Sequence, residues 1–144
     1  MKNVVEDLIY KEECYRIIGG CFAVYRDKGC GFLEPVYQEC MEIEFEHLKL
    51  PATPKPKLEL SYRGRVLQHT YEPDFICYGK IILELKAVSA LADEHRAQVL
   101  NYLNATGCKL ALLVNFGHHP GLEYERIVNT RTTGRGTTEA EVKF

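Results

Sequence analysis

Tryptophan, close cysteine pairs and internal repeats are all missing from this sequence of 144 residues. No stretch approaches the roughly 20 apolar residues that a membrane-spanning helix requires. Residues 2–13 mix charges and lack the apolar segment of a signal peptide. We therefore expect a cytoplasmic protein that has no contact with a membrane.

A surplus of positive charge is missing as well. The formal net charge is −2 and the isoelectric point is about 6.2, so no global basic field draws the chain to nucleic acid. This counts mildly against a tight, non-specific DNA-binding protein, but not against an enzyme whose metal ions supply positive charge locally. Hydrophobic residues make up 46% of the chain, which is enough for the core of one domain.

The six cysteines are spaced too widely for the close ligand pairs of a structural zinc site. We expect free thiols that are mostly buried, as in proteins of a reducing cytosol. These residues are Cys14, Cys21, Cys30, Cys40, Cys77 and Cys108.

The stretch from residue 72 to residue 86 predicts two short strands joined by a tight turn at residues 78–80. In residues 81–87, the apolar positions 81, 83, 85 and 87 alternate with positions 82, 84 and 86, and this period of two is typical of a strand. This alternation places Glu84 and Lys86 on one face of the strand and the leucine between them on the other.

The length of the turn decides where Asp74 lies. With three residues in the turn, Cys77 pairs with Ile81, and Asp74 falls directly opposite Glu84. Directly opposed residues share a face, with Cβ atoms roughly 4.5–5.5 Å apart. A two-residue turn would place Asp74 on the wrong face. We expect the three-residue turn, which brings the two carboxylates together.

Two neighbouring carboxylates disfavour joint ionisation unless a cation lies between them. A hard divalent ion such as Mg²⁺ removes this conflict and prefers oxygen ligands. Lys86 could then orient or help to deprotonate the attacking water. The alternative is a surface hairpin in which Asp74, Glu84 and Lys86 form an exposed ion pair, and the spacing alone leaves both interpretations open.

Three motifs resemble those of a known family. Pro-Asp at residues 73–74, followed by Glu-Leu-Lys at residues 84–86, resembles the signature of the PD-(D/E)XK nuclease superfamily. Residues 31–37 resemble the motif that names the GxxExxY family, a small branch of that superfamily. Residues 98–102 are similar to the Gln-x-x-x-Tyr element of RecB-like and lambda-exonuclease-like members. The similarity covers roughly residues 4–128, with the motifs in the expected order.

The resemblance implies an α/β, restriction-endonuclease-like fold with a mixed central β-sheet flanked by helices. We expect one such domain over residues 1–128 and a loose, polar tail over residues 129–144. The implied activity is Mg²⁺- or Mn²⁺-dependent hydrolysis of a phosphodiester in nucleic acid, DNA in preference to RNA, with a 5′-phosphate product. A homodimer or a partner protein would fit so small a domain.

Two alternatives to this activity stay open. The first is a catalytically silent module of the same fold that binds nucleic acid or protein, although none of the signature residues is missing. The second is a phosphohydrolase of small nucleotides, which the lack of a Gly-rich phosphate loop argues against.

The resemblance also implies roles for single residues. Asp74, Glu84 and the main-chain carbonyl of Leu85 would bind one or two metal ions. Lys86 would position the attacking water and favour its hydroxide form. Glu34 would complete the outer metal shell through water, although a glutamate in the first turn of a helix also suits the helix dipole.

Periodic apolar residues predict helices over residues 4–27 and 33–48. Gly19-Gly20 in the first helix indicates either a close helix contact or a break. In the second helix, Tyr37 is expected to pack against the sheet. Cys30, just before it, stands where the family usually has a proline, a difference that we expect to be harmless.

A third helix, capped by Ser89 or Asp93 and ending near residues 106–107, would carry His95, Gln98 and Tyr102 in a narrow polar stripe. These three side chains could bind the substrate, and two of them, the glutamine and the tyrosine, could instead hold the lysine of the hairpin in place. Taken alone, the histidine is more typical of a hydrogen-bonding partner within the fold.

Strands are predicted over residues 58–62, 66–71, 109–116 and 124–128, the third of them apolar throughout and therefore buried on both faces. Residues 63–65 form the turn between the first two strands. We expect the two arginines of this turn to be solvated, with contact to a phosphate backbone as the alternative.

Overall fold

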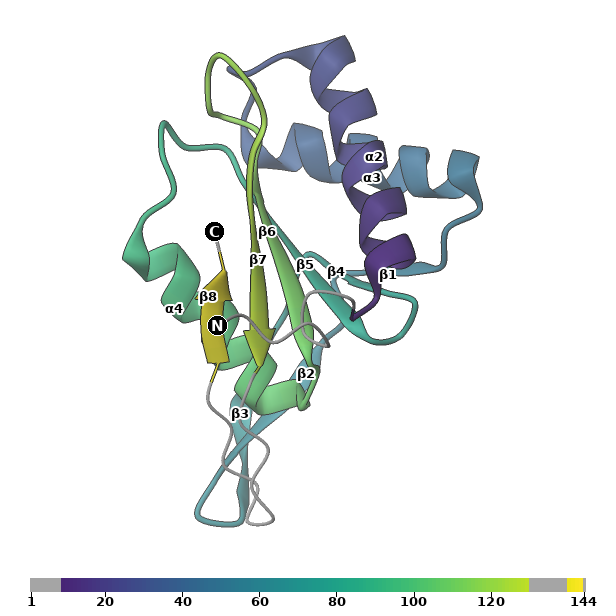
Figure 1. Ribbon diagram of the computed structural model, residues 1–144. Helices are drawn as coiled ribbons and strands as arrows, with labels where there is room; N and C mark the ends of the chain where they lie inside the picture. The colour runs from purple at the N-terminus through teal and green to yellow at the C-terminus, as the bar shows by residue number, and fades with distance from the viewer. Residues whose placement is uncertain (1–8, 130–139, 144) are drawn as a thin grey trace.

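The computed structural model describes residues 9–129 and residues 140–143, and in them a six-stranded mixed sheet has the order β1-β4-β5-β6-β7-β8 (Figure 1). Strands β5 and β6 are parallel, and every other neighbouring pair in this sheet is antiparallel. Two further strands, β2 and β3, form a separate antiparallel pair. The elements are α2 Lys11–Lys28, α3 Glu34–Leu48, β1 Ala52–Pro54, β2 Leu58–Tyr62, β3 Arg65–Tyr71, β4 Phe75–Cys77, β5 Ile81–Lys86, α4 Asp93–Thr106, β6 Leu110–Asn115, β7 Glu123–Asn129 and β8 Ala140–Lys143.

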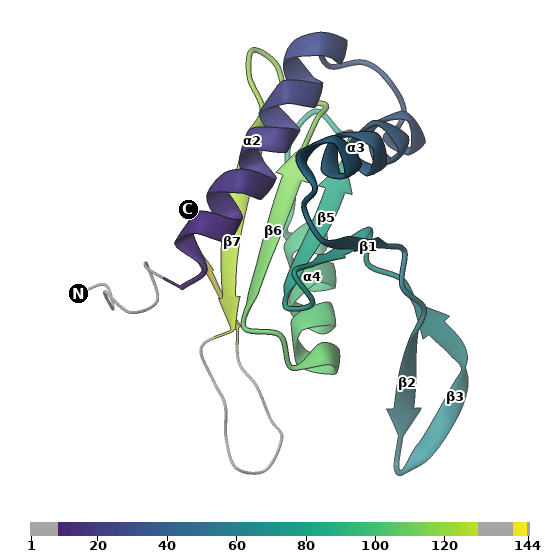
Figure 2. The same cartoon turned by 90° about the vertical axis from the view of Figure 1, so that its right-hand side faces the viewer.

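Different helices cover the two faces of this sheet. Leu83 and Leu85 point to the face that packs against α2 and α3, in the larger of two core clusters. Ile82 and Leu113 point to the opposite face, where they pack with Val99 of α4. Figure 2 shows α2 in front of the sheet and α4 behind it. The period of two along the strands thus separates the two layers, and the prediction of a mixed sheet flanked by helices is confirmed.

The β5–α4–β6 unit forms the centre of the domain. Parallel neighbours need a crossover connection, and α4 supplies it. All six residues of β6 are buried, as are the first five of β5. The continuous apolar run that predicted a strand buried on both faces is therefore confirmed.

In the described part of the chain, helix α2 covers only the later part of the helix predicted over residues 4–27. It starts at Lys11, because Ile9 lies in a turn and Tyr10 has a left-handed backbone with φ of 53°. The expectation of helix over residues 4–8 falls outside the described part of the chain. Gly20 lies within the unbroken helix, and a Cβ added there would meet the Leu48 side chain at 3.4 Å. The helix is therefore unbroken, and Gly20 lies in close contact with α3, whereas nothing lies within 4 Å of a Cβ added at Gly19.

The β2–β3 hairpin projects from the body of the domain (Figure 2). Its turn has two residues, Arg63 and Gly64, because Tyr62 pairs with Arg65. The prediction of a three-residue turn is therefore wrong, and β3 begins one residue early. Glycine suits the turn because its φ is +76°.

The polar C-terminal segment is more ordered than expected. Residues 140–143 form strand β8, which pairs with Arg126–Asn129 of β7, so the prediction of a loose tail is wrong for this part. Polar composition concealed a strand whose main-chain hydrogen bonds extend the sheet edge. Residues 130–139 lie outside the described part of the chain.

The prediction of free, mostly buried cysteines is confirmed only in part. All six thiols are free. The prediction that they are buried holds only for Cys14, Cys21 and Cys77, since Cys30 is exposed and the other two are half-buried.

Helix α4 begins at Asp93, and its N-cap residue is Ala92, which has no side chain that could cap the helix. Neither of the two expected residues, Ser89 and Asp93, is therefore the N-cap. Among the described residues, no helix is both long and apolar enough to cross a membrane.

Candidate active site

The turn between β4 and β5 has the length that brings the two acids together. Cys77 pairs with Ile81, and the Lys80 N–H donates to the Cys77 carbonyl at 3.0 Å. Tyr78 and Gly79 both have positive φ, the conformation typical of tight hairpin turns. The predicted three-residue turn and its register are confirmed.

Two hydrogen bonds, one in each direction, join Asp74 to the Glu84-Leu85 segment of β5. The Asp74 N–H donates to Glu84 Oε1 at 2.8 Å. In return, the Leu85 N–H donates to Asp74 Oδ2 at 2.7 Å. Each carboxylate thus uses one oxygen to hold the backbone of the other strand, which leaves Asp74 Oδ1 and Glu84 Oε2 for other partners.

Both carboxylates lie inside the protein, at 8% and 3% relative exposure for Asp74 and Glu84. Burial, reinforced by the nearby Glu34 charge and opposed by the Leu85 N–H, raises the pKa of Asp74 to about 6. Burial and then the charge of Asp74 raise the pKa of Glu84 to about 8. Neither acid therefore ionises easily beside the other without a compensating cation.

Helix α2 supports the hairpin from its turn. Arg16 donates to the Tyr78 hydroxyl at 3.0 Å and to the Leu48 carbonyl at 2.6 Å. At the same turn, the Lys80 ammonium lies 2.8 Å from a Glu13 carboxylate oxygen. These contacts tie the hairpin to both helices of one layer and limit its movement relative to the sheet.

Lys86 is held by α4 more closely than by the neighbouring acid. Its ammonium donates to Gln98 Oε1 at 2.7 Å and lies 3.7 Å from Glu84 Oε2. Gln98 Nε2 in turn donates to the Tyr102 hydroxyl at 3.2 Å. Because Gln98 and Tyr102 are one helical turn apart, they form a continuous polar row that ends at the lysine.

Tyr102 joins this row to the projecting hairpin. Its ring stacks on that of Tyr71, with centroids 5.4 Å apart. Burial and the charges of Glu84 and Asp74 raise the pKa of Tyr102 to about 12, so its hydroxyl stays protonated. The hydroxyl therefore remains able to donate a hydrogen bond.

Glu34 and Gln38 approach Asp74 from α3. Glu34 is the first residue of the helix, and its charge helps to raise the pKa of both hairpin acids, which places it near them. Gln38, one turn later, donates from Nε2 to the Asp74 carbonyl at 3.2 Å. The sequence analysis missed Gln38, although its spacing of four residues from Glu34 could have revealed it.

Tyr37 fixes the loop that leads into α3. Its hydroxyl donates to the Gly29 carbonyl at 2.6 Å and accepts from the Phe32 N–H at 3.3 Å. The buried ring stacks on Phe116, with centroids 4.6 Å apart. The expected packing against the sheet is confirmed, and it determines where Glu34 begins the helix.

The His95 side chain forms a hydrogen bond with the main chain at the N-terminus of its own helix, α4. Its Nδ1 accepts the Ala92 N–H at 2.9 Å, and its Nε2 lies 3.9 Å from a Glu94 carboxylate oxygen. In the part of the chain that the structure describes, no hydrogen bond or ion pair joins it to Lys86 or the two acids, whereas Gln98 and Tyr102 are joined to the lysine directly or through one residue. The structure therefore brings together two of the three members of the polar stripe.

A second polar group, which the sequence analysis missed, holds the loop after β5. Asn115 is fully buried, and its Oδ1 accepts from the N–H groups of Val88 and Gly117 at 3.0 Å each. Its Nδ2 donates to Glu123 Oε1, also at 3.0 Å. A Cβ at position 117 would lie 2.4 Å from the Val88 carbonyl oxygen, so only glycine permits this approach. The one polar side chain in an otherwise apolar strand was the available signal.

The main-chain carbonyl of Leu85 lies on the Asp74 side of β5. The Lys86 carbonyl accepts from the Phe116 N–H at 2.7 Å, so the main-chain groups of Lys86 face β6. Main-chain groups of successive strand residues alternate between the two edges of a strand. Those of Leu85 therefore face the opposite edge, where its N–H meets Asp74.

The donor set fits an incomplete site for a hard cation. In residues 9–129 and 140–143, no three His, Cys, Asp or Glu side chains gather as a ready-made metal site. Mg²⁺, however, is commonly bound through one or two carboxylates, with water and substrate phosphates as the remaining ligands. Two buried carboxylates with raised pKa match that pattern, since each binds the opposite strand through one oxygen only, although Glu84 Oε2 also lies 3.7 Å from the Lys86 ammonium.

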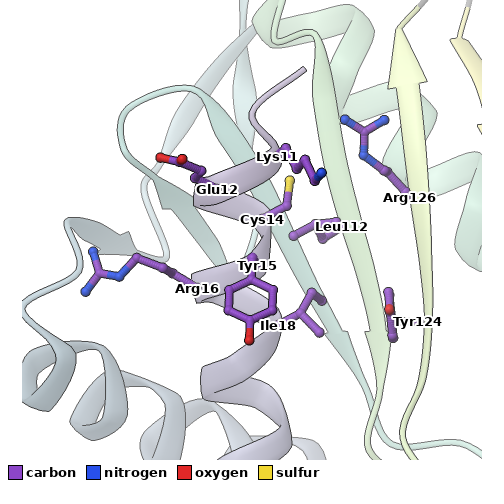
Figure 3. A pocket seen from close by; sticks show the side chains of 9 residues that line it. All are labelled: Lys11, Glu12, Cys14, Tyr15, Arg16, Ile18, Leu112, Tyr124 and Arg126. Carbon is purple, nitrogen blue, oxygen red and sulfur yellow. The ribbon is translucent and has the colours of Figure 1, made fainter. Parts of the chain in front are cut away.

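A cavity of about 660 Å³ lies elsewhere, between α2 and strands β6 and β7 (Figure 3). Ile18 and Leu112 line it, together with Lys11 and Arg126. Leu112 belongs to the core cluster of the α2 and α3 face, so the cavity is separated by the sheet from the side chains of Glu84 and Lys86.

Comparison with known proteins agrees with this geometry. The model of the PD-(D/E)XK nuclease superfamily matches residues 11–127. The fold and the matched length define a nuclease-type domain, and the chain belongs to the PD-(D/E)XK nuclease superfamily. A search of curated proteins finds no match.

A solved structure described as "Crystal structure of SSO0001" has a similar fold, with a TM-score of 0.51 and 17% identity. The match covers 85% of the present chain and 59% of the other, so this chain spans less than two thirds of that protein. At this identity the likeness shows the fold alone.

Proposed function

We propose that the protein hydrolyses phosphodiester bonds of nucleic acid, DNA in preference to RNA, with Mg²⁺ or Mn²⁺ as cofactor. The observation that carries this proposal is the pair of hydrogen bonds between Asp74 and the Glu84-Leu85 segment. They hold two buried carboxylates on one face of the hairpin, beside a lysine. Membership in the nuclease superfamily agrees with this activity.

Asp74, Glu84 and the Leu85 carbonyl are the groups that would hold the metal, and Glu34 would add to its outer shell through water. When bound, the cation would neutralise the carboxylates and stabilise the charge that develops on the phosphate. Lys86 would orient the attacking water and favour loss of its proton. Attack of the water oxygen at phosphorus would break the bond between phosphorus and the 3′ oxygen, which leaves a 5′-phosphate on one product and a 3′-hydroxyl, protonated from solvent, on the other.

The remaining side chains would position these groups. Gln98 would hold the Lys86 ammonium through its 2.7 Å hydrogen bond, so that the lysine lies closer to the glutamine than to Glu84, which is 3.7 Å away. Gln38 would hold the backbone at Asp74. The hydrogen bond of Tyr37 to the loop before α3 supports our proposed assignment to the GxxExxY branch, whose motif residues 31–37 resemble. The six free thiols are consistent with a cytoplasmic location.

A catalytically silent binding module is the second candidate. Its support is the buried state of the carboxylates, since two protonated acids could also serve only to join the strands of the hairpin. The lysine argues for activity, because its contact with Gln98 leaves it beside the carboxylates instead of in solvent.

The test is a cleavage assay on single-stranded, duplex and branched DNA and on RNA, with Mg²⁺ or Mn²⁺. The wild-type protein should cleave at least one substrate, and Asp74→Ala and Lys86→Ala should abolish this activity. Glu42→Ala, at an exposed position of α3, is the matched control and should cleave as wild type does. Equal trace activity in all variants would identify a contaminant and favour the silent module.

A further inference from the structure

The β2–β3 hairpin, from Leu58 to Tyr71 and here called the arm, has little packing of its own. Residues 61–70 are all exposed, on both faces of the two-stranded ribbon. Among them are apolar side chains that a free surface rarely favours, with Tyr62 67% and Val66 64% exposed. An isolated two-stranded hairpin is marginally stable in water, so a projecting ribbon of this composition is suited to contact another molecule.

The arm and the segment leading into it are basic in an acidic protein. Residues 55–71 carry four basic side chains and one acidic one, a formal charge of +3, whereas the whole chain has a net charge of −2. Arg63 and Arg65 lie at the tip, and the Arg63 guanidinium is 5.9 Å from the Tyr62 ring centroid. A local basic segment with an exposed aromatic ring is suited to a polyanion that also has flat rings.

A groove joins the arm to the candidate active site. It has a volume of about 500 Å³ and lies between the arm and α4, lined by Leu60, Tyr71, Asn101, Tyr102, Asn104 and Ala105. No charged side chain is among these residues. Tyr102 is one of the lining residues, and from it hydrogen bonds run through Gln98 to Lys86.

We propose that the arm and this groove bind the nucleic-acid strand on one side of the phosphate that is cleaved. The identity of the ligand rests on the proposed function. Arg63 and Arg65 contact backbone phosphates, Tyr62 stacks on a base, and the tyrosines and asparagines of the groove pack along the strand. The local charge explains how a chain of net negative charge binds a polyanion.

The length of the arm sets the distance between this contact and the site. Strand β3 has seven residues, which span about 23 Å at roughly 3.3 Å per residue. Nucleotides are spaced about 3.4 Å apart along one strand of B-form DNA. The tip therefore reaches a phosphate about six or seven nucleotides from the cleaved bond, and only substrates that extend that far use the arm.

The first experiment measures binding. Fluorescence anisotropy with labelled single-stranded and duplex 20-mers compares Arg63→Ala/Arg65→Ala with Lys11→Ala/Arg26→Ala, all in the Lys86→Ala background. The control pair removes the same charge from exposed positions on α2, which packs on the other face of the sheet. The arm variant should bind about tenfold more weakly, and its plot of log affinity against log salt should be shallower by about 1.4 for single strands or 1.8 for duplex. The form of nucleic acid, single-stranded or duplex, for which the arm variant loses more affinity is the form that the arm binds.

The second experiment measures cleavage as a function of substrate length, with the lysine intact. Wild type should have a lower KM for substrates with ten nucleotides beyond the cleaved bond than for those with four. The arm variant should lose this preference, with kcat unchanged. Thermal unfolding of the arm variant should match that of wild type, because the side chains at the tip are exposed.

Several results would overturn the proposal. These are equal binding by the arm and control variants, an unchanged length preference, or a wild-type dimer that the arm substitutions dissociate in size-exclusion chromatography. The last result would show that a second copy occupies the arm. A protein that binds nucleic acid through the arm but cleaves nothing would refute the proposed hydrolysis and leave the arm proposal standing.

Discussion

The Lys86 ammonium is 2.7 Å from Gln98 Oε1 and 3.7 Å from Glu84 Oε2. The lysine is thus hydrogen-bonded to a neutral partner on another element, and its ion pair with the acid two residues before it is the longer of the two contacts. A neutral hydrogen bond directs the ammonium without neutralising its charge, so the lysine keeps the ability to act on a water molecule near the carboxylates.

This relationship predicts a graded effect of substitutions on α4. Gln98→Ala should lower kcat by about tenfold or more, a loss typical of residues that orient catalytic groups. Tyr102→Phe should lower kcat by a smaller factor, because the tyrosine hydroxyl reaches Lys86 only through Gln98. The double variant should be no worse than Gln98→Ala alone in single-turnover cleavage. Additive losses would contradict action through a shared row.

The buried acids predict an unusual dependence of stability on pH without metal. Both carboxyl groups have a raised pKa in the folded protein, whereas in the unfolded chain they titrate near pH 4. The folded state therefore binds more protons above pH 4, so the free energy of unfolding falls as the pH rises from about 4 towards 8.

Glu84→Gln should reduce this fall, because the amide keeps the oxygen that accepts the Asp74 N–H but carries no charge. Urea unfolding in EDTA should show the variant at least about 1.4 kcal/mol more stable than wild type at pH 8, the equivalent of one pKa unit. At pH 4 the difference should be small. Glu42→Gln, on the exposed side of α3, should leave the pH profile unchanged. Parallel profiles for wild type and Glu84→Gln would refute the assignment.

The close approach of two loops at Gly117 predicts a local sensitivity. Gly117→Ala should lower the free energy of unfolding by about 1–3 kcal/mol, because the added methyl meets the Val88 backbone at 2.4 Å. Gly121→Ala, where nothing lies within 4 Å of the added atom, should have little effect in the same urea titration. Equal stability of the two variants would contradict this prediction, because it would show that the loop after β5 shifts to accommodate the added methyl without loss of stability.

The β4–β5 hairpin was predictable because its information is local. A period of two and a three-residue turn placed Asp74 opposite Glu84, and the register of the structure agrees. The apolar run of β6 was predictable for the same reason, since burial on both faces leaves a continuous hydrophobic signal.

Other features depend on tertiary packing, even where the sequence holds a local signal. Gln38 and Asn115 act through partners 36 and 27 residues away in the chain. His95 was expected in a stripe facing the substrate, but its Nδ1 accepts a hydrogen bond at the start of its own helix. Strand β8 has only four residues, so the alternation of Ala140 and Val142 with two charged residues does not stand out within a polar segment. Tertiary packing decides each of these cases.

The most direct test of the account is calorimetric titration of Mg²⁺ or Mn²⁺ into wild type and three variants. Asp74→Ala and Glu84→Ala should each weaken metal binding by at least about tenfold, because each removes one of the two carboxylates that would hold the ion. Lys86→Ala should bind at least as tightly as wild type, because it removes a competing positive charge. Equal metal affinity in wild type and Asp74→Ala would contradict the central claim that the two acids of the hairpin form a cation site.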